Sequence, residues 1–175
     1  MKDGGMKNSE YPDKTKTNLD CAVRIRPADV SDRDFIFSLL PRLIEFEIPS
    51  CRTLEQMTAG DKRVIERVLS TNPSGTAVFI AQDDDGESLG FIHLTSAVDY
   101  YTEEKHGHIS DIVVASAGEG RGVGRLLMAA GEEWAHAQGY RLLTLNVFVQ
   151  NTRARKLYEK LGFGEDMLKY IKEIR

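Results

Sequence analysis

Alternating glycines mark the stretch of this sequence whose residue types and spacing could do chemistry. The glycines are Gly118, Gly120, Gly122 and Gly124. They follow the apolar residues 112–114 and lead into a segment with helical periodicity. Glycine permits a tight turn and lets backbone N–H groups approach a ligand. The first N–H groups of the following helix are unpaired and carry a partial positive charge. The pattern therefore predicts a phosphate or pyrophosphate site, to which Arg121 and Arg125 add positive charge.

The spacing of these glycines disfavours the common nucleotide-binding motifs. A Walker loop needs Lys and then Ser or Thr after its last glycine, whereas Arg125 and Leu126 stand there. The dinucleotide pattern G-x-G-x-x-G fails in both registers, because its final position falls on Val123 or on Arg125. A flexible turn that caps a helix is the structural alternative to a ligand site.

A second group of candidate residues follows the predicted helix. Asn151, Ala154 and Tyr158 recur at helical spacing and share one face. The side chain of Asn151 can cap a helix or reach a ligand amide, and the small Ala154 leaves room for a ligand beside it. Tyr158 is either a core aromatic residue with its hydroxyl at the surface or a proton donor.

The two stretches together resemble the Gcn5-related N-acetyltransferase (GNAT) superfamily. Residues 119–124, Glu-Gly-Arg-Gly-Val-Gly, resemble its coenzyme A pyrophosphate loop, Arg/Gln-x-x-Gly-x-Gly/Ala, with Glu119 where Arg or Gln is usual. Residues 151–163 fill every position of its Asn-x-x-Ala-x-x-Leu-Tyr-x-x-x-Gly-Phe signature. The resemblance covers residues 23–175. It implies cofactor contacts from Ile112, Val113, Val114, Glu119, Gly120, Arg121, Gly122, Val123, Gly124, Arg125, Asn151, Ala154 and Tyr158.

The resemblance also implies a reaction, in which the acetyl group of acetyl-CoA passes to a primary amine that attacks the thioester directly. Tyr158 is the implied general acid to the departing thiolate. His108 falls where one branch of the family places its catalytic Glu, and Asp111 falls at a position that is often acidic in other branches. Their side chains point to opposite faces of a strand unless a bulge intervenes. A solvated strand residue and a structural carboxylate are the respective alternatives.

The acceptor is left open between a small-molecule amine and an amine of a protein or peptide. The family's acceptor walls correspond to residues 42–52, with Glu45, Phe46 and Glu47, and to residues 99–101, Asp-Tyr-Tyr. Carboxylates and aromatic rings there would suit a cationic amine. Two rival functions are a non-catalytic acyl-CoA-binding or sensor module, suggested by Glu119, and a P-loop phosphotransferase. His106 and His108 lack a complete ligand set, so no metal is expected.

Composition narrows the classes of function further. The 175 residues carry mixed charges and a formal net charge of −4, whereas nucleic-acid modules concentrate basic residues on one face. No stretch has the roughly 20 apolar residues that span a bilayer, and residues 1–20 resemble a flexible arm rather than a secretion signal. Cys21 and Cys51 are too few for a disulfide framework. We expect a cytoplasmic protein with one domain over residues 21–175, no nucleic-acid or membrane partner, and a homodimer as an open alternative.

The elements that must position these residues follow from hydrophobic periodicity. Strands are predicted near residues 23–26, 76–81, 89–98, 107–114, 142–149 and 167–174, and helices from Asp29 or Ser31 to Leu43, over 53–69, 122–138 and 151–161. The helix over 122–138 should bury positions 123, 126, 127, 130, 134 and 137. This order predicts a layered α/β (α+β) fold. The resemblance implies a mixed, mostly antiparallel sheet with splayed central strands, flanked by about four helices.

Overall fold

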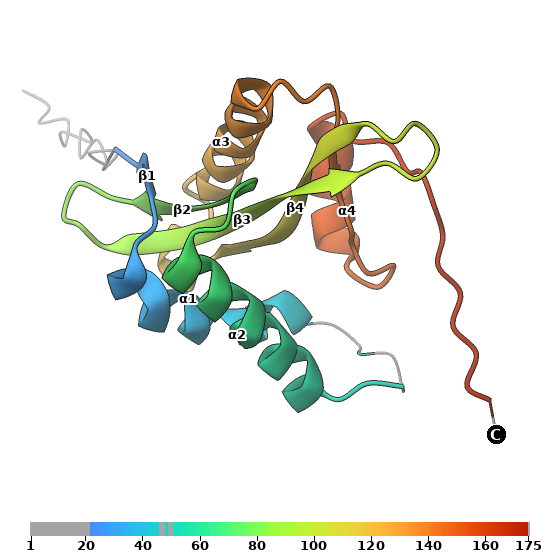
Figure 1. The fold of residues 1–175 in the computed structure, drawn as a ribbon. Coiled ribbons are helices and arrows are strands. Elements are labelled where there is room, and N and C mark those ends of the chain that lie inside the picture. Colours follow the sequence, from blue (N-terminus) through green and yellow to red (C-terminus); the bar gives the residue numbers. More distant parts are fainter. Residues whose placement is uncertain (1–21, 46–47, 49–50, 175) are drawn as a thin grey trace, which may run out of the picture.

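Five strands in the order β1-β2-β3-β4-β5 form the sheet that carries the candidate site (Figure 1). The computed structural model describes residues 22–45, 48 and 51–174, so the predicted arm over residues 1–20 lies outside the described residues. The strands are β1 Arg24–Pro27, β2 Thr76–Gln82, β3 Ser88–Val98, β4 Lys105–Val114 and β5 Leu143–Leu145. The first four pair antiparallel, and β5 runs parallel to β4. This arrangement confirms the predicted mixed sheet.

One face of the sheet is covered by the helical segments that precede β2 (Figure 1). They are η1 Val30–Asp32, α1 Arg33–Leu39, η2 Leu40–Ile44 and α2 Leu54–Thr71. Asp29 caps η1, and Thr53 and Gln56 form a capping box at the start of α2. The predicted first helix is broken into three pieces, and Pro41, which has no N–H to donate, lies at the start of η2. The core on this face includes Ile36, Leu40, Ile65 and Phe91, which are fully buried.

The other face is covered by α3 Val123–Ala137, and the short helix α4 Thr152–Lys160 packs its inner face against the same core. Among the positions predicted to be buried on α3, Val123 and Leu127 are buried, but Leu126 is 39% exposed. The contact stripe instead runs through Gly131, where an added Cβ would lie only 3.1 Å from Ile92 Cδ1. The buried residues of α3 are Val123, Leu127, Met128, Gly131 and Ala135, and the predicted positions Leu126 and Ala137 are exposed.

An extra residue in β4 changes which side chains share a face of the sheet. His93 pairs with Asp111, yet the next residue of β3 pairs with Ile109, so Ser110 is a bulge. Ile109 packs towards α3. Because the bulge absorbs one position, His108 and Asp111 both lie on the face covered by α1 and α2, which settles the alternative that the sequence left open.

Two predicted strands near the C-terminus differ from the structure. The strand predicted over 142–149 is reduced to the three residues of β5, and the strand predicted over 167–174 is wrong, because these residues have no regular structure. Met167 and Tyr170 are 80% and 89% exposed. A strand needs a neighbouring edge to satisfy its backbone groups, and three residues of β5 offer little of one. Alternating apolar residues alone therefore did not produce a strand.

Candidate active site

The glycine loop begins directly after β4 and ends in the first turn of α3. Gly120 and Gly122 have φ of 75° and 77°, a left-handed conformation that glycine adopts without strain. Gly122 is the N-cap of α3 and has no side chain to satisfy the helix N–H groups. Within the described part of the chain, the N–H groups of Gly120, Gly122, Val123 and Gly124 have no hydrogen-bond acceptor. A Cβ at Gly120 or Gly122 would meet nothing within 4 Å, so the space beside these N–H groups is open. The geometry suits an anionic phosphate.

The strand that leads into this loop has one unpaired edge. Pairing between β4 and β5 covers only residues 107–109, so residues 110–114 of β4 have no strand partner on that side among the described residues. The N–H of Ala115 donates to Leu89 on β3. Because N–H directions alternate along a strand, the N–H groups of Ile112 and Val114 point to the open edge. Beyond residue 109 the two strands no longer pair, and an extended ligand can add to the free edge of β4 like a further strand.

Glu119, the residue that departs from the family pattern, is held by two arginines. Its carboxylate contacts the guanidinium of Arg42 on η2 at 2.5 Å and that of Arg153 on α4 at 3.6 Å. Arg42 also donates to the hydroxyl of Ser116 at the start of the loop. The two cations offset the acidic charge beside the open N–H groups. Arg121 does not point freely to solvent, because its guanidinium lies 3.4 Å from the buried carboxylate of Asp83. Arg125 is exposed.

His108 and Asp111 lie together on the face covered by α2. His108 Nδ1 lies 2.8 Å from the hydroxyl of Thr144, its neighbour on β5. Burial lowers the pKa of the His108 imidazole, the nearby His106 lowers it further and Asp111 opposes the shift. The neutral ring is therefore the form present at pH 7, and a neutral imidazole can accept a proton.

His93 is a residue of this site that the sequence analysis missed. It lies in the middle of β3, is 0% exposed, and its Nδ1 lies 2.9 Å from Asp111 Oδ2. Among the described residues, Nε2 has no hydrogen-bond partner. The signal that could have revealed it is a histidine inside the otherwise apolar run of β3, since a buried polar side chain needs a partner.

Asp61 on α2 is the second residue that the sequence analysis missed. It occupies a helical position one turn before the buried Ile65, where the periodicity calls for an apolar side chain. Burial raises the pKa of its carboxyl from 3.8 to about 6, and the charge of Asp111 adds to the effect. No cation pairs with Asp61 or Asp111 within the described residues, apart from any charge on His93. The face below α2 is therefore rich in uncompensated negative charge.

Tyr158 belongs to the opposite side of β4. It packs with Phe163 against the core beneath α3 and α4, with a ring-centroid distance of 6.0 Å. Its helix adjoins the loop, because a Cβ at Gly124 would lie 3.7 Å from Val114 and 3.9 Å from Leu157. Burial raises the pKa of the Tyr158 hydroxyl, which keeps the proton on it at neutral pH.

Asn151 and Ala154 occupy the first turn of α4. The side-chain oxygen of Asn151 accepts a hydrogen bond of 3.1 Å from the N–H of Ala154, so capping is the role that the structure displays. Ala154 is half-buried on the same inner face as Tyr158. These positions place the small side chain and the phenol on the side of α4 that faces the core.

The predicted acceptor walls are only partly described. Phe46 and Glu47 lie outside the described residues. The carboxylate of Asp99 accepts hydrogen bonds from the turn N–H groups of Tyr101 and Thr102. In the part of the chain that the structure describes, no three His, Cys, Asp or Glu residues are arranged to hold a metal ion, and no helix is long and apolar enough to cross a membrane.

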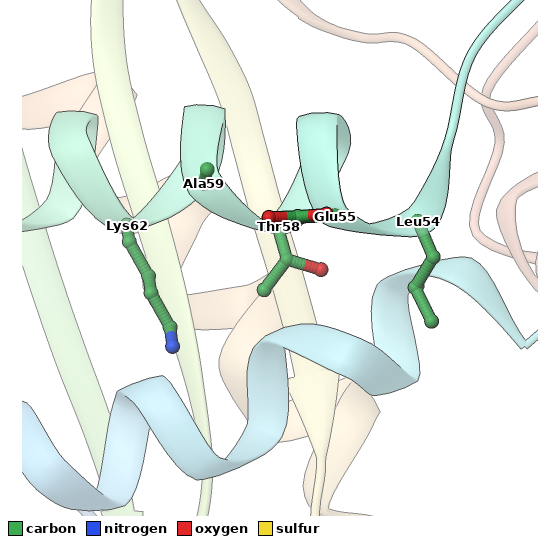
Figure 2. A pocket seen from close by; sticks show the side chains of 5 residues that line it. All are labelled: Leu54, Glu55, Thr58, Ala59 and Lys62. Carbon is green, nitrogen blue, oxygen red and sulfur yellow. The ribbon is translucent and has the colours of Figure 1, made fainter.

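A shallow depression of about 330 Å³ lies elsewhere on α2. Figure 2 shows Leu54, Thr58 and Lys62 pointing from α2 towards the segment that contains α1 and η2. Glu55 and Ala59 complete its lining, and none of the candidate catalytic residues belongs to it. The depression is therefore not part of the candidate active site.

Comparison with known proteins agrees with this geometry. The model of the acetyltransferase (GNAT) family matches residues 40–163. YhfO of Bacillus subtilis strain 168, described as an uncharacterized N-acetyltransferase, is 27% identical over 145 residues, which are 82% of this chain and 91% of that protein. Aminoglycoside N(6')-acetyltransferase type 1 of Stenotrophomonas maltophilia is 35% identical over 92 residues, or 51% of this chain, and the match spans only 60% of the relative.

Solved structures share the fold. An acetyl transferase from Pyrococcus furiosus, described as putative, superposes with a TM-score of 0.71 at 24% identity, over 87% of this chain and 100% of that one. Aminoglycoside N-acetyltransferase AAC(6')-Iy, solved in complex with CoA, gives a TM-score of 0.66 at 23% identity, over 88% of this chain and 95% of that one. The family model spans most of the chain, and the glycine loop and the α4 motif both lie inside the matched range. The chain belongs to the GNAT family of acetyltransferases.

Proposed function

We propose that this protein transfers the acetyl group of acetyl-CoA to a primary amine by direct attack of the amine on the thioester. The observation that carries the proposal is the unpaired edge of β4, which runs straight into four open N–H groups at the start of α3. The edge fits an extended amide-containing arm, and the N–H groups fit a pyrophosphate. Coenzyme A combines these two features in one molecule.

The proton-transfer groups lie on the two sides of that edge. An alkylammonium must lose a proton before it can attack, because its pKa is about 10.4. His108 and Asp111, on the face below α2, are the groups that can take this proton. Tyr158, on the side of α4, keeps its own proton and can give it to the departing thiolate. The N–H groups of Ile112 and Val114 point to the open edge between them, where an oxyanion would be stabilised.

The charges below α2 favour a cationic small molecule as acceptor. Asp61 and Asp111 are half-buried carboxylates without an arginine or lysine partner among the described residues. Bringing an ammonium group to them restores the charge balance that burial otherwise makes costly. Relatives named for aminoglycoside, streptothricin and mycothiol acetylation are consistent with a small-molecule acceptor.

An amine panel tests the proposal. The protein is mixed with acetyl-CoA and one amine at a time, including a diamine, an aminoglycoside, an amino acid and a peptide with a free N-terminus, and release of free thiol is followed. We expect turnover with at least one small cationic amine and little with the peptide. Binding of coenzyme A without thiol release for any amine would favour the alternative of a non-catalytic acyl-CoA sensor. A preference for the peptide would overturn the choice of acceptor class but not the reaction.

A further inference from the structure

Among the described residues, His93 is the one fully buried polar side chain of the site that the reaction described above does not use. It stands opposite Asp111 in the β3–β4 register and contacts it through Nδ1 and Oδ2 at 2.9 Å. The contact lies next to the bulge at Ser110, where the register between the strands shifts. A hydrogen bond at this point fixes the orientation of the Asp111 carboxylate as well as the register.

The donor in this contact follows from the chemistry of the two groups. A carboxylate oxygen only accepts, so Nδ1 of His93 carries a proton and donates it to Oδ2 of Asp111. Nε2 is buried and has no partner among the described residues. Oδ1 of Asp111 has no hydrogen-bond partner within the described residues and is left for another donor.

We propose that His93 is a positioning residue for acetyl transfer: by donating to Oδ2 of Asp111, it directs Oδ1 towards the acceptor ammonium. Oδ1 takes one proton from the ammonium, and the freed nitrogen lone pair forms the bond to the thioester carbonyl carbon. The C–S bond breaks, the departing thiolate takes the proton of Tyr158, and the second proton lost by the nitrogen returns to Tyr158 through solvent. His93 keeps its Nδ1 proton throughout. This role rests on the proposed function, because it needs a proton to be removed from an amine.

Other charged groups face this pair and must be considered in any pH profile. Asp61 approaches from α2, His108 lies on the same face of β4, and Arg42 of η2 is engaged with Glu119 at the glycine loop. None of these donates to Asp111 in the described structure. His93 is therefore the one donor to that carboxylate among the described residues, and replacing it removes the orientation without removing a second contact.

Two polar substitutions of His93 separate positioning from simple structural support. His93→Asn keeps an N–H donor close to the place of Nδ1, whereas His93→Gln moves the donor one bond further from the backbone. With the best amine of the panel, we expect His93→Asn to lose about threefold in kcat and His93→Gln about 30-fold, in line with the loss of an oriented general base. KM for acetyl-CoA should stay unchanged in both. The acidic limb of the kcat/KM profile should move to higher pH in His93→Gln only.

A double-mutant cycle tests whether His93 acts through Asp111. In an Asp111→Asn background, replacing His93 should cost no further activity, because there is no carboxylate left to orient. Equal kcat in His93→Gln and the wild type would overturn the role, as would equal losses in Asn and Gln variants that follow their loss of thermal stability, or full additivity in the cycle. If the wild type turns over no amine, the proposed function fails together with this role. If the wild type is active and His93→Gln is equally active, only this role fails.

Discussion

Asp61 offers the sharpest test of the electrostatics, because its effect on stability has a sign that depends on pH. Its carboxyl has a pKa raised from 3.8 to about 6 by burial and by Asp111. Below about pH 4 the folded and unfolded chains both hold the proton. Between the two values the folded chain holds it and the unfolded chain does not, so stability falls as the pH rises through this window. Above pH 6 the full penalty of a half-buried carboxylate is present.

The size of the effect follows from the shift. A rise of about two pKa units corresponds to about 3 kcal/mol at full value. Asp61 is half-buried rather than enclosed, so water screens part of the penalty and we expect about 1–2 kcal/mol. Asp61→Asn keeps the shape and removes the charge at every pH. At pH 7.5 it should raise the free energy of unfolding by that amount, which corresponds to a rise of several degrees in Tm, and at pH 4 it should change little.

Urea unfolding at pH 4, 6 and 7.5 measures this difference directly. Asp34→Asn is the matched control, because Asp34 lies on the neighbouring α1 with its side chain 94% exposed, and neutralising it should change stability by less than about 0.5 kcal/mol at any pH. A constant difference between Asp61→Asn and the wild type across the three pH values would refute the reasoning. A variant less stable than the wild type at pH 7.5 would show that the ionised carboxylate is stabilised by a partner, not penalised by burial.

Three further substitutions test the cofactor and proton-donor assignments. Tyr158→Phe should lower kcat about 100-fold with KM for acetyl-CoA unchanged, in an assay limited by chemistry; normal turnover would remove Tyr158 from the mechanism. Gly122→Ala forces a Cβ into a left-handed conformation at φ 77° and should weaken coenzyme A binding, measured by calorimetry, about tenfold. Gly139→Ala is the control, because Gly139 has a similar φ beyond the far end of α3, and this substitution should affect only stability. Arg42→Ala removes a cation that offsets the negative charge of Glu119 and should raise the Kd of coenzyme A about fivefold. The double variant Arg42→Ala/Glu119→Gln should restore the Kd of the wild type. An unrestored Kd would mean that Arg42 acts in another way.

Much of the fold follows from local rules that the sequence displays. Thr53 and Gln56 form the capping box that starts α2, and Asn151 caps α4 as its residue type predicts. Gly122 adopts the left-handed conformation that only glycine accepts readily. These features need only residues that are close in the chain, so a linear pattern is sufficient to predict them.

The remainder depends on pairings between distant residues. The contact of His93 with Asp111 joins residues 18 positions apart and requires the exact register of β3 on β4. In the sequence, Asp111 does not differ from a solvated strand residue, and His93 differs only by its place in an apolar run. The exposed segment that includes Tyr170 failed as a strand prediction for the same reason, because alternation describes one strand and says nothing about a neighbouring edge.

The bulge at Ser110 links the core to the site. Pairing between β4 and β5 ends at Ile109, directly before the bulge, so the strand leaves its neighbour at the point where it gains a residue. If β4 ran without the extra residue, every side chain on one side of that point would change face. Either Ile109, 3% exposed, would leave the core beneath α3, or Asp111 would turn away from His93. One residue in excess therefore lets the same strand bury Ile109 under α3, present His108 and Asp111 below α2, and leave the N–H groups of residues 112 and 114 on an open edge between the two.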